Sequence, residues 1–190
     1  MPLIRLTKKL QREIGITPAK LAVVQEPLTP FGQWYAHIFF LNQEKQIIFV
    51  EPRTLFSFSV DGVSREDLRE RLAEIFRKGL GLALYNEGAS GDVIAKVLNS
   101  CRGRLEFAKT DSKKTVGVLN EFVKDHKFNF LDEGMPLEER NRHIRYMPMR
   151  GFTYPYAEKL DLPIAVFAQV IMKQFDLPFT PNYGCPFAKR

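Results

Sequence analysis

Two apolar segments constrain the fold of this chain most strongly, residues 34–41 (WYAHIFFL) and 46–51 (QIIFVE). Residues 42–45 between them are polar and make a loop of hairpin length. Successive side chains point to opposite faces of a strand, and both faces of the first segment are largely apolar, with His37 among them. A strand that is apolar on both faces is typical of the centre of a sheet, so we expect His37 to be packed there.

Shorter patterns place the other elements around this hairpin. Strand signals occur at residues 3–6, 21–24, 55–60 and 104–108, and helical periodicity occurs at 7–14, 64–85, 90–98, 112–130, 136–146 and 163–175. Strands come first and helices later without regular alternation, which indicates the α+β class. We predict a small, mainly antiparallel sheet, built from the N-terminal strand and the central hairpin, packed against several helices.

The length of 190 residues suits one domain, or one domain with an appended segment. We expect a single compact α+β domain over residues 1–160. Four prolines fall within residues 161–190, which are expected to form a C-terminal helix followed by a proline-rich arm or tail.

The chain is basic, with a formal net charge of +6 and a pI of about 9.3. Positive charge attracts polyanions whatever the fold, although the same charge can serve solubility alone. Lysine and arginine are concentrated in residues 1–20 and 101–127, and neither stretch contains a run of five or six like charges. This distribution excludes a basic tail and permits a basic face, which would suit nucleic acid or a small phosphate as a partner.

Cysteine usage and hydropathy favour a cytoplasmic protein. Cys101 and Cys185 are far apart in the sequence, and the first residues lack a long apolar leader. The most apolar window, residues 163–172, is much shorter than the roughly 20 residues that cross a bilayer. We therefore expect no membrane partner.

The three histidines do not form a catalytic pattern in the sequence. His37 and His126 lie on apolar faces, where a packed histidine is expected, and His143 lies one turn after Glu139 on a charged helix. Neither HExxH nor CxxC spacing occurs, and the phosphate-binding loop and the dinucleotide fingerprint are absent from the sequence. Cys101 is expected to be a buried, unreactive thiol. We predict no metal and no cofactor, and catalytic residues stay unknown.

The first candidate site is a junction at residues 105–120 (LEFAKTDSKKTVGVLN), where an apparent strand passes into a helix. A helix N-terminus offers unpaired N–H groups and positive potential, so lysines in its first turn suggest a bound anion. Backbone, hydroxyl and ammonium groups together would hold a phosphate, whichever of residues 111 and 112 is the N-cap. The alternative is plain capping with solvated lysines. The residues of this anion-binding hypothesis are Lys109, Thr110, Ser112, Lys113 and Lys114.

The second candidate site is a basic segment formed by Arg140, Arg142 and Arg145, which precede a run of aromatic side chains between residues 146 and 156. Cations beside exposed aromatics suit single-stranded nucleic acid, which is held by backbone attraction and base stacking. The alternative is an ordinary charged helix that leads into an aromatic strand of the core.

Four segments carry a family resemblance. They are LIRLTKKL at residues 3–10, PFGQWYAHIFFLNQEKQIIFVEPRTLFSFSV at 30–60, FAKTDSKKTVGVLNEF at 107–122 and RNRHIRYMPM at 140–149. Together they resemble a bacterial family classed only as a domain of unknown function, whose members are often labelled hypothetical or plasmid-encoded proteins. The resemblance implies one compact cytosolic domain that begins with a strand and a short helix, and it implies no activity or catalytic residue.

These patterns favour a non-enzymatic module that binds an anionic partner, nucleic acid before small phosphate. One alternative is a protein-interaction module that forms a homo-oligomer through the C-terminal arm. Another is an enzyme that acts on a phosphorylated or carboxylated metabolite, with His37 or His126 as its acid–base group and the lysines as an anion clamp.

Overall fold

The computed structural model of this chain describes residues 2–23, 31–149 and 161–182. Two predicted features lie outside the described residues: the aromatic strand within 150–160 and the tail over 183–190. The segment predicted as a strand at residues 21–24 is described up to residue 23. There the amide of Ala22 donates to the Phe107 carbonyl at 2.7 Å.

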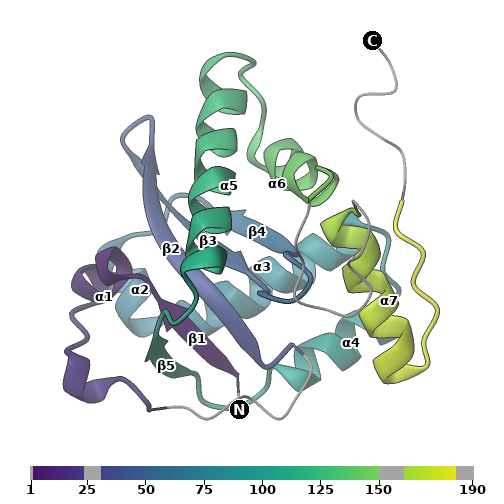
Figure 1. Ribbon diagram of the computed structural model, residues 1–190, viewed down its shortest axis with the longest axis horizontal. Helices are drawn as coiled ribbons and strands as arrows, with labels where there is room; N and C mark the ends of the chain where they lie inside the picture. Colours follow the sequence, from purple (N-terminus) through teal and green to yellow (C-terminus); the bar gives the residue numbers. More distant parts are fainter. Residues whose placement is uncertain (1, 24–30, 150–160, 183–190) are drawn as a thin grey trace.

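Five strands form one mixed sheet in the order β4-β3-β2-β1-β5 (Figure 1). The central strand pairs β2–β3 and β3–β4 are antiparallel, whereas β1 runs parallel to both of its neighbours, β2 and β5. The predicted α+β class is confirmed, and the sheet contains as many parallel as antiparallel pairings. The strands are β1 (Leu3–Leu6), β2 (Gln33–Leu41), β3 (Glu44–Val50), β4 (Ser57–Val60) and β5 (Glu106–Lys109).

The predicted hairpin forms β2 and β3, and its loop is shorter than expected. Asn42 and Gln43 adopt φ values of 46° and 66°, the left-handed pair that a two-residue type I′ turn requires. Glu44 and Lys45 therefore continue the ladder, where they pair with Leu41 and Phe40. The twist of this turn matches that of the strands, so the hairpin can close with two residues fewer than the polar stretch in the sequence.

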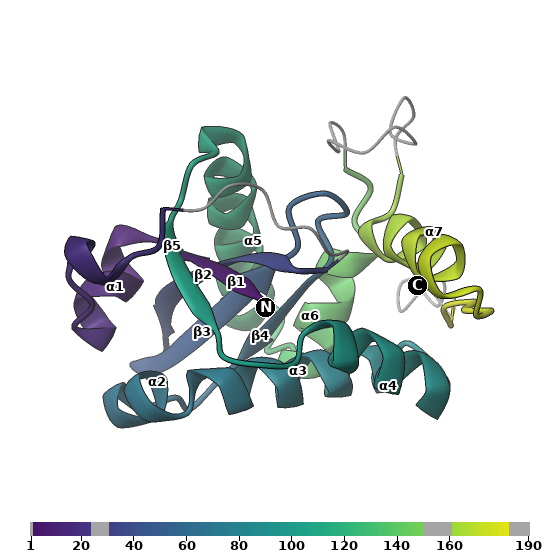
Figure 2. The same ribbon diagram turned by 90° about the horizontal axis from the view of Figure 1, so that it is seen from below.

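Helices cover both faces of the sheet (Figure 2). On one face lie α1, α2, α3 and α4, whose core includes Trp34, Phe49 and Phe76. On the other lie α5 and α6, which pack on Tyr35 and Phe39. Alternation along β2 thus separates two cores, as its apolar pattern predicts. The helices are α1 (Lys8–Ile14), α2 (Arg65–Glu70), α3 (Leu72–Asn86), α4 (Gly91–Ser100), α5 (Lys113–Leu131), α6 (Leu137–Arg145) and α7 (Pro163–Phe175), with a 3-10 turn η1 (Pro18–Lys20) after α1.

Helix α3 packs unusually closely against the edge strand β4. A Cβ atom on Gly79 would lie 2.6 Å from the Phe58 ring, whereas one on Gly81 would lie 3.5 Å from Leu98, at ordinary contact distance. Gly79 is therefore the residue that lets α3 approach the sheet at this point. The helix predicted over 64–85 is divided at Arg71 into α2 and α3.

Helix α7 packs into the core that contains Trp34, Phe49 and Phe76. The Phe167 ring lies 4.0 Å from that of Phe56 and 4.6 Å from that of Phe31, between ring centroids. Beyond the helix, Phe179 is also buried, and the backbone N–H of Asn182 donates to the backbone carbonyl of Glu87 at 3.1 Å. The proline-rich segment therefore packs against its own chain as far as residue 182.

Candidate anion-binding site

The first candidate site lies at the edge of the sheet where β1 and β5 end. The two strands are adjacent and parallel, with Leu6 opposite Lys109 at their carboxyl ends. The helix that follows β1, α1, packs on one face of the sheet, and the helix that follows β5, α5, packs on the other. Such a divergence opens a crevice outside the strand ends, where ligands bind in open α/β sheets.

A cleft of about 420 Å³ occupies this position. Helix α1 contributes Lys8, Gln11 and Arg12, and the end of β5 contributes Lys109 and Thr110. The apolar side chains of Ile16 and Pro18 complete its wall. Three cations from two distant segments therefore meet in one concavity, and none of the described residues that line it is acidic.

The backbone behind the cleft is held by a charged network. Arg5 Nη1 donates to the Lys109 carbonyl at 2.9 Å, and Nη2 of the same guanidinium lies 2.7 Å from Asp111 Oδ2. The Tyr35 hydroxyl donates to the other carboxylate oxygen of Asp111. Burial, followed by this hydrogen bond, raises the pKa of Tyr35 to about 12. The Asp111 carboxylate is therefore engaged by Arg5 and Tyr35 from β1 and β2.

The structure selects Ser112 as the N-cap of α5. Its Oγ accepts a hydrogen bond from the Thr115 amide at 3.1 Å. Helix geometry leaves the amides of Lys113 and Lys114 without an intrahelical acceptor, and both of these side chains are exposed. Of the five predicted residues, Lys109 and Thr110 line the cleft, and the other three form the adjoining first turn of α5.

The sequence hypothesis missed the contribution of α1. Lys8, Gln11 and Arg12 lie about a hundred residues before Lys109 in the sequence, and they reach it only because β1 and β5 pair. The excess of basic residues over 1–20 was the one signal available, and it carried no information about the partner segment.

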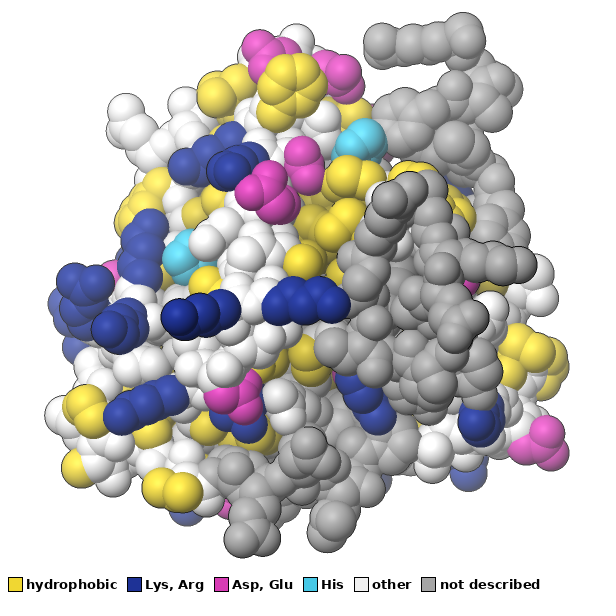
Figure 3. Space-filling model, viewed as in Figure 1, with side chains coloured by type: hydrophobic (Ala, Val, Ile, Leu, Met, Phe, Trp, Pro, Cys, Tyr) yellow, Lys and Arg dark blue, Asp and Glu magenta, His cyan; other side chains and the backbone are white. Residues whose placement is uncertain are grey.

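Positive charge extends from the cleft over the neighbouring surface. Figure 3 shows lysine and arginine side chains gathered over α1 and the start of α5. Lys9 and Lys127 are exposed on this side of the molecule, and they act on His37. Burial, with a smaller effect of these lysines, lowers the pKa of His37 to about 4, and its Nδ1 lies 2.9 Å from Thr7 Oγ1. His37 is therefore neutral at physiological pH.

The second candidate site does not form an exposed basic surface. Arg145 is 1% exposed and pairs with Glu87 at 2.6 Å, and Arg140 is 2% exposed and donates to the Met135 carbonyl at 2.9 Å. Only Arg142 is partly accessible, with Nη2 2.6 Å from the carbonyl of residue 182. The charged pattern of α6 suggested a surface, but two of its three arginines face the interior.

The other potentially reactive side chains lie away from the cleft. His126 is fully buried, its Nε2 is 2.9 Å from Ser59 Oγ, and burial lowers its pKa to about 3. Cys101 is also buried, and desolvation raises its thiol pKa to about 11. No group of three His, Cys, Asp or Glu side chains in the described ranges could hold a metal ion. The cleft itself offers cations, an amide and a hydroxyl, which suit binding of an anion.

Comparison with known proteins identifies the family. Within the described ranges, every helix is too short or too polar to cross a membrane. No curated protein and no solved structure matches the chain. A family model described as a domain of unknown function (DUF6933) matches residues 3–158. The match covers most of the chain, which confirms the resemblance to a family of this kind, and the protein therefore belongs to the DUF6933 family.

Proposed function

We propose that this protein is a non-enzymatic module that binds a phosphate-bearing partner in the cleft at the carboxyl ends of β1 and β5. The observation that carries the proposal is the convergence of Lys8, Arg12 and Lys109 in a cleft without a lining carboxylate. We place the protein in the bacterial cytosol, on the grounds of its cysteine usage and its family resemblance.

The cleft combines the groups that phosphate recognition uses. A guanidinium such as that of Arg12 can donate two parallel hydrogen bonds to phosphate oxygens, and the ammonium groups of Lys8 and Lys109 add positive charge. Ile16 and Pro18 provide an apolar surface for the remainder of the ligand. The volume of about 420 Å³ lies within the usual range for ligand sites.

The charge beyond the cleft favours nucleic acid before a small phosphate. Lys9, Lys113, Lys114 and Lys127 are exposed outside the lining of the cleft. A single phosphate compound would occupy only the cleft, whereas a strand that enters the cleft can also follow the lysines around it. Each neutralised phosphate releases condensed counterions, so binding should weaken steeply as salt increases.

The histidines argue for binding without catalysis. The Nδ1 atom of His37 is engaged by Thr7, and His126 of α5 is buried against Ser59 and Phe39 of the sheet. Neither lines the cleft. Lysine, arginine and threonine can hold a phosphate there, and the described lining of the cleft contains no histidine or carboxylate to act as a general acid or base.

The test is a titration of fluorescently labelled single-stranded DNA and RNA at low salt, with inorganic pyrophosphate as competitor. The double variant Arg12→Ala and Lys109→Ala should reduce the slope of log affinity against log salt by about 2. Lys96→Ala is the matched control, because Lys96 is an exposed cation on α4, away from the cleft.

The outcomes separate the two kinds of ligand. Oligonucleotide binding that the double variant weakens supports the nucleic-acid proposal. Binding of pyrophosphate alone assigns the cleft to a small phosphate compound. If the folded wild-type protein binds neither, or if Lys96→Ala has the same effect as the double variant, the proposal is wrong.

A further inference from the structure

A second pocket lies at the opposite edge of the sheet, between α3, the edge strand β4 and α6. Its volume is about 280 Å³. The apolar walls are formed by Phe58, Val60, Ile75, Leu82, Ala83 and Leu137. Ligand sites are typically concave and apolar with a few placed polar groups, and this pocket has that composition.

The backbone N–H and C=O groups on the outer edge of β4 form hydrogen bonds with side chains of α6 and not with another strand. Asn141 Oδ1 accepts from the Ser59 amide at 2.7 Å, and its Nδ2 donates to the Ser59 carbonyl at 3.0 Å. Arg145 Nη1 donates to the Ser57 carbonyl at 3.2 Å, and the same guanidinium pairs with Glu87. The backbone of the strand and the buried arginine are therefore already bonded, which leaves mainly apolar surface free inside the pocket.

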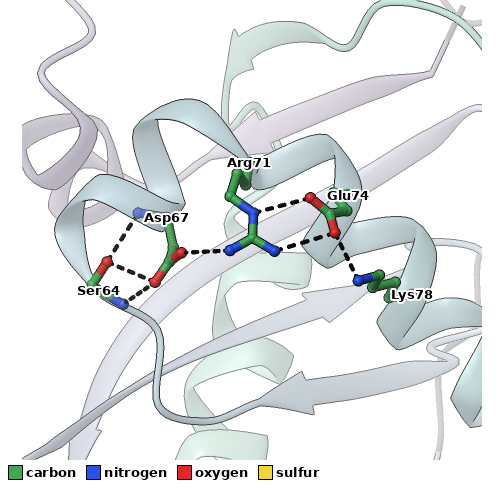
Figure 4. Close-up of polar contacts among 5 residues, drawn as sticks. All are labelled: Ser64, Asp67, Arg71, Glu74 and Lys78. Atoms are coloured by element: carbon green, nitrogen blue, oxygen red, sulfur yellow. Dashed lines mark hydrogen bonds and ion pairs between the residues drawn. The ribbon is translucent and has the colours of Figure 1, made fainter.

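The rim of the pocket carries an excess of negative charge. Lys78 lies there, but its ammonium is 2.7 Å from Glu74, which also pairs with Arg71 (Figure 4). Asp61 and Glu138 are exposed at the same rim, and neither has an ion-pair partner within the described ranges. Among the described residues of the rim, the one cation, Lys78, is therefore already ion-paired, and two carboxylates remain without such a partner.

Arg140 offsets part of this excess, because its guanidinium interacts electrostatically with Asp61. The Arg140 side chain itself is buried and bonded to the Met135 carbonyl. The Asp61 carboxylate itself stays exposed to solvent. A cationic group that approaches the rim from solvent therefore meets two carboxylates.

We infer that this pocket binds a small organic cation, with an apolar body between α3 and α6 and an ammonium group at Asp61 and Glu138. Burial of the apolar body supplies the driving force, because the walls are hydrocarbon. The two carboxylates select for positive charge. This site is independent of the basic cleft, which lies at the other edge of the sheet and selects for negative charge.

The test compares probes of similar shape and different charge on the full chain. These are 2-phenylethylamine, 2-phenylethanol and phenylacetate, with binding followed by protein-detected NMR titration. Two partly exposed ion pairs should favour the amine over the alcohol by about 3- to 10-fold. The double variant Asp61→Asn and Glu138→Gln should bind both equally, whereas Glu133→Gln, an exposed acid on another loop, should keep the preference.

A second variant tests the position of the ammonium group. Leu82 is 60% exposed, so Leu82→Lys should leave the fold intact and place a like charge at the rim. We expect this variant to bind 2-phenylethylamine more weakly, and phenylacetate more tightly, than the wild-type protein does. Equal affinity of the wild-type protein for all three probes, absence of binding, or shift changes outside the pocket would overturn the proposal.

Discussion

Replacement of Glu87 by alanine would leave a buried guanidinium without its carboxylate. The side chains of Glu87 and Arg145 are 0% and 1% exposed, and Glu87 Oε1 lies 2.7 Å from Arg145 Nε and 2.6 Å from Nη2. The other carboxylate oxygen accepts from the Tyr146 hydroxyl at 2.8 Å. After the substitution, the hydrogen bond that remains to Arg145 among the described contacts is that to the Ser57 carbonyl.

The expected loss of stability follows from the burial of the Arg145 charge without its carboxylate partner. Removal of one partner from a buried ion pair typically costs about 3–5 kcal/mol, because the other charge stays buried and uncompensated. Domains of this kind have total stabilities of about 5–15 kcal/mol, so Glu87→Ala should lose a large part of the free energy of unfolding. The double variant Glu87→Leu and Arg145→Met buries no charge, and it should be more stable than Glu87→Ala.

Urea unfolding measures both effects, with the fluorescence of Trp34 as probe because the chain has one tryptophan and it is fully buried. Glu121→Ala is the control, since the ion pair of Glu121 with Lys124 is exposed and its removal should cause no measurable change. The reasoning is refuted if Glu87→Ala is within about 1 kcal/mol of the wild type, or if the double variant is no more stable than Glu87→Ala.

Two further predictions concern packing and pH. Gly79→Ala should destabilise the protein by about 1–3 kcal/mol, because the new methyl group would overlap the Phe58 ring. Gly81→Ala should be neutral or stabilising, because its methyl group would meet Leu98 at ordinary contact distance. The melting temperatures of the two variants test this difference. His126 is neutral in the folded state, and its pKa falls from 6.5 to about 3, so its contribution to stability is present above pH 6.5 and is lost as the pH falls toward 3. Urea unfolding as a function of pH should show this slope, and His126→Gln should flatten it; an unchanged slope would contradict the assignment.

Local patterns predicted the elements of this fold well. The two-sided apolar pattern of residues 34–41 predicted the hairpin strand β2, and the strand-to-helix junction after residue 105 predicted β5 and α5. Such patterns depend on neighbours a few residues apart, so they can be read from the chain alone. The same local information could not predict the pairing partner of a strand, and β1 proved to be parallel to both β2 and β5.

Burial of charge was the other point that the sequence could not show. Arg140 and Arg145 stand in a helix segment rich in charged residues, which is the pattern of a solvent-exposed face. Arg145 is buried because Glu87, 58 residues earlier, supplies a carboxylate in the interior. A buried arginine needs such a partner, and only the folded chain brings the two together.

The sequence by itself therefore determined the α+β class, the central hairpin and the strand-to-helix junction that carries Lys109, because each depends on periodicity and capping among adjacent residues. The tertiary structure decided which cations meet. Pairing of β1 with β5 brings Lys8 and Arg12 of α1 to Lys109, and these three cations line one cleft at the strand ends. Contacts between residues so distant in the chain arise from strand pairing and core packing, which the local pattern does not encode.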